Sequence, residues 1–236
     1  MNKDNRKLID IRRYRNESYD LDIFGIKRKL PLCRIEDEVW IVVNEPLCFG
    51  CDVEFTGKIA GELSKRIAFF QPDVLLTPET KAVALTYEIT RQLHLPRYVL
   101  ARKSHKKCVE KVVKTQVSPI TTPEPHELFL DESDVKYLQG KRVVLLDDVL
   151  STGSTMRGLK DLTVKSKAEV CAIAVVWLEG PWVFEEFTDE LQKGQVVFLD
   201  IFPLYATGVT YKNLLKEKKR IELKGLCYNT LVQKPS

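Results

Sequence analysis

The stretch Val143-Val-Leu-Leu-Asp147-Asp148-Val-Leu-Ser151-Thr152-Gly153-Ser154-Thr155 is the most informative part of this sequence. Its apolar residues predict a buried strand that ends in two carboxylates, and a short hydroxyl-rich turn then leads into a helix beginning near Gly153. A helix N-terminus offers unpaired N–H groups and positive charge to a phosphate, and glycine lets the backbone approach it closely. The stretch therefore predicts a sugar-phosphate site at the carboxyl end of a parallel strand, with the acids on ribose hydroxyls.

A purely structural interpretation of this stretch explains less. Ser151 or Ser154 alone could be an ordinary helix cap. A cap requires neither two adjacent acids after four apolar residues nor a hydroxyl on each side of a glycine. Two other phosphate-binding patterns, G-x-x-x-x-G-K-[ST] and G-x-G-x-x-G, do not occur in the chain.

Strands and helices alternate around this stretch. We predict strands at 39–43, 73–77, 98–101, 170–177 and 196–199, and helices at 55–70, with Thr56 as N-cap, and from Pro78 to about 93. Apolar strands between helices indicate an α/β fold with a mainly parallel sheet and helices on both faces. We expect a single domain over 1–236, with a core at about 38–200 and a small cap made by the chain ends, about 1–37 and 201–236.

The composition excludes several classes of protein. The formal net charge is +4 over 236 residues and the basic residues are scattered, so nothing indicates a nucleic-acid partner. No apolar run approaches the roughly 20 residues of a membrane span, and the first residues lack the apolar core of a secretion signal. We therefore expect a cytoplasmic protein that does not bind a membrane.

The six cysteines predict free thiols and no disulfide framework. Cys171 lies in an apolar run typical of a core strand. Cys48-Phe-Gly-Cys51 has the spacing of a metal or redox site, but zinc would need two further ligands and no second such pair is present. A structural role is therefore the favoured interpretation of Cys48 and Cys51.

The 143–155 stretch resembles the signature by which type I phosphoribosyltransferases bind phosphoribosyl pyrophosphate (PRPP). The resemblance spans about residues 55 to 200 and implies transfer of ribose 5-phosphate to a nitrogenous base with release of pyrophosphate. It implies that Asp147 and Asp148 hold the ribose hydroxyls and stabilise positive charge on the ring. It assigns the phosphate to Ser151, Thr152, Gly153, Ser154 and Thr155.

Two further segments resemble parts of the same family. Thr77-Pro-Glu79-Thr80-Lys81-Ala82, taken alone an ordinary helix start, is similar to the pyrophosphate loop. This likeness assigns PRPP to Glu79, Thr80, Lys81 and Ala82. The basic segment at Arg102 and Lys103 opens a connection to about residue 128, too long for an ordinary αβ loop, that resembles the mobile loop closing over PRPP.

The resemblance also implies the remaining chemistry. Arg102 and Lys103 would bind PRPP, Lys103 is assigned a catalytic role, and the general acid or base has no firm candidate beyond a guess at Glu110. Mg²⁺ is the expected cofactor, held mainly by PRPP with no direct protein ligand, and a homodimer is expected.

The acceptor base is expected to be a purine, with adenine first, in a purine-salvage reaction. Residues 96–103 and 118–122 are most similar to the adenine phosphoribosyltransferase branch. Leu178 and Trp182, at and after the end of a predicted strand, are the candidates for contact with the base.

Two other functions stay open. A PRPP-binding regulator without catalysis would need a DNA-binding module, and the forty-odd residues before the core are too few for one. An enzyme of the same fold that uses hypoxanthine, xanthine, a pyrimidine or another base fits the same residues.

Overall fold

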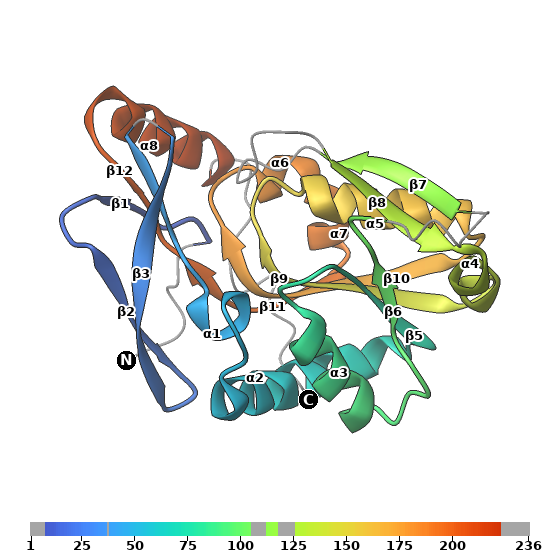
Figure 1. Cartoon of the computed structure of the whole chain (residues 1–236). Helices are drawn as coiled ribbons and strands as arrows, with labels where there is room; N and C mark the ends of the chain where they lie inside the picture. Colours follow the sequence, from blue (N-terminus) through green and yellow to red (C-terminus); the bar gives the residue numbers. More distant parts are fainter. Residues whose placement is uncertain (1–7, 37, 105–111, 118–125, 223–236) are drawn as a thin grey trace.

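The core of the protein is a parallel sheet (Figure 1). The computed structural model describes residues 8–36, 38–104, 112–117 and 126–222. Within these ranges the core sheet has the order β11-β10-β9-β5-β6, and every neighbouring pair is parallel. Its strands are β5 (Val74–Pro78), β6 (Val99–Ala101), β9 (Arg142–Leu150), β10 (Glu169–Glu179) and β11 (Val196–Phe202). The α/β expectation is confirmed.

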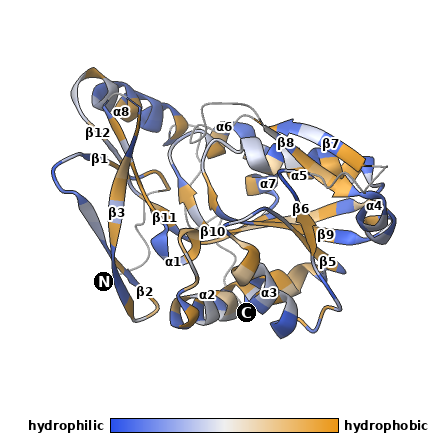
Figure 2. Ribbon diagram, in the orientation of Figure 1, coloured by the Kyte–Doolittle hydropathy of each residue, from blue (hydrophilic) through white to orange (hydrophobic). Residues whose placement is uncertain are grey.

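Helices cover both faces of the core sheet. In Figure 1, α2 (Val53–Ile67) and α3 (Val83–Gln92) lie below the sheet, and α5 (Ser154–Lys165) lies above it. Each face has its own apolar cluster, and the strand residues alternate between the two. Ile59, Leu63 and Ile67 are fully buried, which confirms the predicted inner face of α2. Figure 2 shows the same pattern as hydrophobic strands between helices with one polar side.

Two predicted helix starts are wrong. The N-cap of α2 is Asp52 and not Thr56, because the Asp52 side chain accepts a hydrogen bond from the Phe55 N–H at 3.0 Å. The helix thus begins two residues earlier than the apolar pattern suggested. Helix α3 begins at Val83, because Pro78 still belongs to β5 and a turn follows it. The peptide bond between Glu79 and Thr80 in this turn is cis.

A second sheet joins the two ends of the chain. Its order is β1-β12-β4-β3-β2, and α8 (Gly208–Glu222) packs on β1 and β12. Its strands are β1 (Ile11–Arg13), β2 (Ser18–Ile23), β3 (Ile26–Glu36), β4 (Val39–Val42) and β12 (Leu204–Ala206). Strand β4 was placed in the core by sequence, but it pairs with β3 and β12. Its apolar run resembles a core strand, and only its partners show that it belongs to this sheet.

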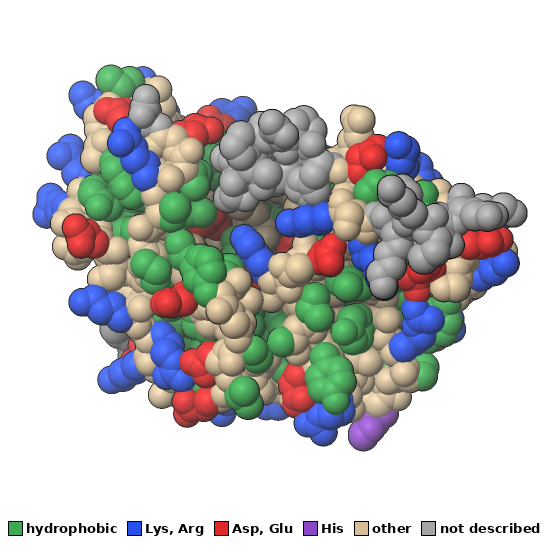
Figure 3. Space-filling view, in the orientation of Figure 1, with side chains coloured by type: hydrophobic (Ala, Val, Ile, Leu, Met, Phe, Trp, Pro, Cys, Tyr) green, Lys and Arg blue, Asp and Glu red, His purple; other side chains and the backbone are tan. Residues whose placement is uncertain are grey.

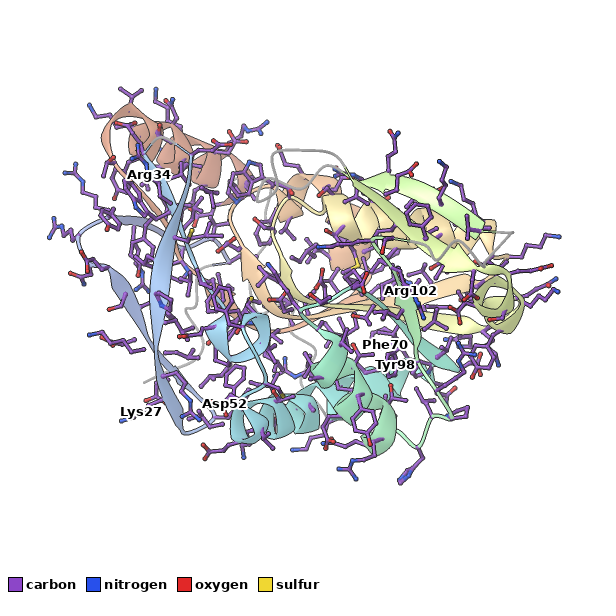
Figure 4. All side chains as sticks on the ribbon, in the orientation of Figure 1. Lys27, Arg34, Asp52, Phe70, Tyr98 and Arg102 are labelled. Carbon is purple, nitrogen blue, oxygen red and sulfur yellow. The ribbon has the colours of Figure 1, made fainter. Side chains whose placement is uncertain are left out.

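A charged hydrogen bond links the second sheet to the core next to α2. Arg28 of β3 donates through Nε to Asp52 at 2.8 Å. Asp52, labelled in Figure 4, lies at the start of α2. The short helix α1 (Glu45–Cys48) continues the chain from β4 to α2. Residues after β4 therefore pass directly from the second sheet to the edge of the core.

The connection from 102 to 128 is not a plain loop. Its described part contains β7 (Val112–Val117) and the start of β8 (His126–Asp131), which pair as an antiparallel hairpin, and α4 (Glu132–Leu138) follows. The hairpin packs on α5 so closely that a Cβ on Gly158 would lie 2.6 Å from a methyl carbon of Val117. The remaining short helices are η2 (Ala68–Phe70), α6 (Val183–Glu186) and α7 (Thr188–Gln192).

Two structural findings concern membrane proteins and DNA-binding regulators. Within the described ranges, no helix is long and apolar enough to cross a membrane. The described residues that precede α1 form strands and turns, with no helix among them. The structure therefore offers no helical DNA-binding module in the described part of the N-terminal segment.

Candidate functional site

A cavity of about 340 Å³ lies where the carboxyl ends of β5, β9 and β10 meet the second sheet. The core supplies acids, lysines and the turn before α5, and the second sheet supplies Ile35, Ile41 and Val42. Figure 3 shows Lys and Arg side chains at the centre of the visible face, between the second sheet on the left and the core on the right. Ligands of parallel α/β folds bind at this edge of the sheet.

The two acids lie inside β9 and not after it, because the strand continues to Leu150. The Asp148 N–H donates to Asp147 Oδ1 at 2.9 Å, and Asp148 Oδ2 accepts from Asn44 Nδ2 at 3.2 Å. Cys48 Sγ lies 3.8 Å from the same Asp148 oxygen. Burial, and then the neighbouring Asp148, raise the pKa of Asp147 well above its usual range. The β9 backbone thus orients Asp147, and two residues from the segment after β4 contact Asp148.

The turn from Ser151 to Thr155 forms one wall of the cavity. Gly153 is the N-cap of α5 and has a φ of +76°, a conformation that favours glycine. A Cβ at this position would lie 2.3 Å from a ring carbon of Phe187, so the packing also requires glycine. The N-terminus of α5 therefore faces the cavity with backbone N–H groups close to any ligand, as a phosphate site needs.

Another part of the cavity lining carries the positive charges. Glu79 joins two chain segments there: its N–H donates to the Ala101 carbonyl, and its Oε2 accepts from the Lys103 N–H, both at 2.9 Å. Glu79, Lys81 and Lys103 line the cavity. Burial lowers the pKa of the Lys81 ammonium, but the nearby acids, Asp148 first, more than offset this and raise it. Lys81 is therefore a stable cation beside the acid pair.

Residues 56–186 match the family described as Phosphoribosyl transferase domain, which covers more than half of the chain. The chain belongs to the phosphoribosyltransferase family. Xanthine phosphoribosyltransferase of Clostridioides difficile is 27% identical over 131 residues, 55% of this chain and 67% of that protein. HGPRTase-like protein 1 of Haloquadratum walsbyi is 27% identical over 134 residues, 56% of this chain and 67% of that protein.

Solved adenine phosphoribosyltransferases share the fold of this family member. The enzyme of Thermoanaerobacter pseudethanolicus superposes with a TM-score of 0.56 at 20% identity, over 79% of this chain and 96% of that one. The Giardia lamblia enzyme, solved with 9-deazaadenine, gives 0.55 at 14% identity, over 78% and 93%. The expected family and fold are confirmed, and the likeness to the adenine branch holds at the level of the fold.

The structure brings most of the expected phosphoribosyltransferase residues to the cavity. Those that line it are Glu79, Lys81, Lys103, Asp147, Asp148, Ser151, Thr152, Gly153, Ser154 and Thr155. Thr80 is exposed and Ala82 is buried, and neither lines the cavity. Arg102, at the end of β6 (Figure 4), does not line it either; its backbone pairs with Phe129. Glu110 and residues 118–122 lie outside the described residues.

The structure does not bring the two predicted base contacts to the cavity. Leu178 is fully buried in the core, and Trp182 packs against the same apolar cluster. Successive side chains of a strand point to opposite faces, so the residue after Leu178 faces the other way. That residue is Glu179, and it lines the cavity.

Sequence reasoning missed the apolar cavity residues Ile35, Ile41 and Val42, and three polar ones: Glu179, Asn44 and Cys48. Glu179 is only 4% exposed, and burial raises its pKa to about 8. Its signal was an acid placed directly after the long apolar run of β10. Burial also raises the pKa of the Cys48 thiol, to about 11, so Cys48 is a neutral part of the wall. No local pattern predicts that Asn44 and Cys48 lie at Asp148, because only the packing of the segment after β4 against the core brings them there.

The lining of the cavity is compatible with Mg²⁺ that is bound mainly by PRPP. Within the described ranges, no group of three or more His, Cys, Asp or Glu side chains could hold a metal ion. Carboxylates and lysines nevertheless line the same cavity, as binding of an anion with its counter-cation requires. Mg²⁺ held mainly by PRPP stays a prediction.

Proposed function

We propose that this chain transfers ribose 5-phosphate from PRPP to a purine base and releases pyrophosphate, with Mg²⁺ as cofactor. The observation that carries the proposal is the meeting of three features at one cavity: the acid pair, the turn before α5, and the Lys81–Lys103 wall. Each feature binds a different part of PRPP: the acid pair binds the ribose, the turn binds the 5-phosphate and the lysines bind the pyrophosphate. Family membership agrees with this use of the site.

The groups that line the cavity differ in chemistry, and they give PRPP one orientation in this proposal. The N–H groups and hydroxyls of Ser151–Thr155 bind the 5-phosphate. The carboxylates of Asp147 and Asp148 accept hydrogen bonds from the ribose hydroxyls. Lys81 and Lys103 then face the pyrophosphate, and the base approaches from the apolar side, where Ile41 and Val42 lie.

The charges of the site support a divalent cation. The acid pair Asp147 and Asp148 lines the same cavity as the two lysines, so the lysines cannot neutralise the ligand alone. A polyanionic ligand in such a site needs further positive charge, because like charges at short range in a partly buried site repel strongly. Bound Mg²⁺ would supply positive charge to the leaving pyrophosphate.

In the transfer step, the protein stabilises developing charges and excludes water. A base nitrogen forms a bond to C1 of the ribose while the bond from C1 to the pyrophosphate oxygen breaks, and the leaving group takes the electron pair. Lys81 and Lys103 stabilise the negative charge that develops on pyrophosphate. Asp147 and Asp148, fixed by Asn44 and the β9 backbone, stabilise the positive charge on the ribose ring. The apolar wall keeps out water, which would otherwise compete with the base.

Two kinds of relative support a purine, and they differ in the base. Solved neighbours of similar fold are adenine phosphoribosyltransferases, whereas curated relatives of higher identity are named xanthine phosphoribosyltransferases. Adenine is the first base proposed, in line with the likeness of residues 96–103, and xanthine is the second. Assembly as a homodimer and a cytoplasmic location stay predictions.

A pyrophosphate-release assay with PRPP, Mg²⁺ and a panel of bases tests the proposal. We expect release with at least one of adenine, hypoxanthine, xanthine and guanine, and none without Mg²⁺. Turnover with orotate or uracil alone would refute the purine assignment and keep the reaction. Binding of PRPP without turnover of any base would instead support the regulator.

A further inference from the structure

Glu179 has an unusual position for an acid. It is the last residue of β10, its side chain is 4% exposed, and its Oε1 has no hydrogen-bond partner. It nevertheless lines the cavity, together with the apolar residues Ile35, Ile41 and Val42. A buried polar atom without a partner costs about 1–3 kcal/mol, so such an atom in a cavity wall indicates a ligand that completes its hydrogen bonding.

The groups around Glu179 determine the protonation state of its carboxyl group. The Ser151 side chain and the Val42 backbone N–H interact favourably with the carboxyl group, and Lys81 adds a smaller favourable charge. Burial and Asp148 act in the opposite direction, and together they raise its pKa to about 8. Glu179 is therefore mostly neutral near pH 7. Oε1, which has no partner in the structure, is the oxygen free to interact with a ligand.

The cavity beside Glu179 offers apolar contacts to a base. Val42, whose backbone acts on the Glu179 carboxyl group, lines the cavity together with Ile35 and Ile41. Ser151 and Lys81 also act on Glu179, but the proposed function assigns them to the phosphates of PRPP, so the base is the part of the substrates that is left for Oε1. A flat purine can bury its faces against Ile35, Ile41 and Val42 and still offer polar atoms along its edge. The protonated carboxyl can donate a hydrogen bond to one of these atoms.

We propose that Glu179 is a specificity-determining residue that binds the purine as a neutral carboxylic acid, donating from Oε1 to a carbonyl oxygen or ring nitrogen on the edge of the base. This assignment rests on the proposed function. It replaces Leu178 and Trp182 as the base contact at the end of β10.

Substitution of Glu179 by Gln and by Ala tests the proposal, because Gln keeps an N–H donor that cannot ionise. The control is Glu169→Gln, which changes an exposed acid at the other end of the same strand. We measure kcat and KM for the base between about pH 6 and about pH 9.5, on both sides of the carboxyl pKa. Calorimetry gives the PRPP Kd of each variant.

The variants are expected to differ in the pH dependence of kcat/KM and in the KM for the base. In the unaltered chain and in Glu169→Gln, kcat/KM for the base falls above about pH 8, by up to tenfold per pH unit. In Glu179→Gln this fall is absent and activity near pH 7 is kept. In Glu179→Ala the KM for the base rises about tenfold while the PRPP Kd changes less than twofold.

Two results would overturn the assignment alone. One is the same alkaline fall in Glu179→Gln as in the unaltered chain. The other is a PRPP Kd that rises as much as the KM for the base, because Glu179 would then only support Ser151 in the phosphate turn. If the unaltered chain turns over no base at all, the proposed function fails and the assignment fails with it.

Discussion

The two ends of the cavity, for which we propose binding of the phosphates of PRPP and of the base, are built in different ways. At the phosphate end, the acid pair and the turn from Ser151 to Thr155 come from one continuous segment, and a single strand–turn–helix unit orients them. At the base end, the wall combines Ile35 and Ile41 of the second sheet with Glu179 of the core, far apart in the chain. The phosphate end is thus a local structure, and the base end exists only when two sheets meet.

This difference predicts that the two ends respond differently to substitution. The geometry of the turn from Ser151 to Thr155 depends mainly on neighbouring residues of one segment. A wall made by two sheets changes whenever their packing changes. Variants at the phosphate end should therefore affect PRPP, and variants at the base end should affect the base.

The largest effect is expected from the acid pair. Replacing both Asp147 and Asp148 by Asn should lower PRPP affinity at least about 100-fold, because two hydrogen bonds from ribose to charged groups are lost, each worth about 1.5–3 kcal/mol. Calorimetric titration measures the loss, and the thermal midpoint shows that the variant is folded. Asp189→Asn, an exposed acid in α7, is the control. An unchanged PRPP Kd would remove the ribose-binding role.

The next effect is expected at Gly153. Gly153→Ala should weaken PRPP binding about tenfold or more, because Ala is strained at a φ of +76° and its Cβ would lie 2.3 Å from Phe187. Gly57→Ala in α2, where a Cβ meets nothing within 4 Å, is the matched control and should leave binding unchanged. Equal binding by the two variants would show that the phosphate end does not depend on this turn.

An intermediate effect concerns stability and pH. The folded chain keeps a proton on Glu179 up to about pH 8, whereas the unfolded chain releases it near the ordinary pKa of 4.5. The free energy of unfolding should therefore fall as the pH rises between these two values, because the folded state binds more protons there. Thermal unfolding without ligand should show a midpoint some degrees lower at pH 8 than at pH 5. The decrease should be smaller in Glu179→Gln; an identical decrease would mean that other groups, such as Asp147, cause it.

The smallest effect is expected from the apolar wall of the base end. Ile41→Val removes one methylene group, worth about 0.8 kcal/mol when buried, so the KM for the base should rise about threefold to fourfold. The PRPP Kd should stay the same. Ile23→Val, in β2 and away from the cavity, is the control. A change in the PRPP Kd of the Ile41 variant would show that the two ends of the cavity are not independent.

Much of the core could be predicted, because its signals are local. The apolar strands, the inner face of α2 and the start of α5 at Gly153 follow from periodicity and turn chemistry over a few residues. The errors lie where two local signals compete. Asp52 and Thr56 are both good caps, and Pro78 can open a helix or end a strand. In each case the tertiary partners of the segment decide between them.

The sequence by itself determined the phosphate end of this protein, since the acid pair, the hydroxyl turn and the required glycine are consecutive residues whose backbone geometry is local. It also showed an acid at the end of β10, but not what that acid does. Only the tertiary structure decided that β4 leaves the core for a second sheet, that Asn44 and Cys48 reach Asp148, and that Glu179 and not Leu178 faces the cavity. The physical reason is that sheet partners and strand faces are set by contacts between distant segments, which no local pattern of residues encodes.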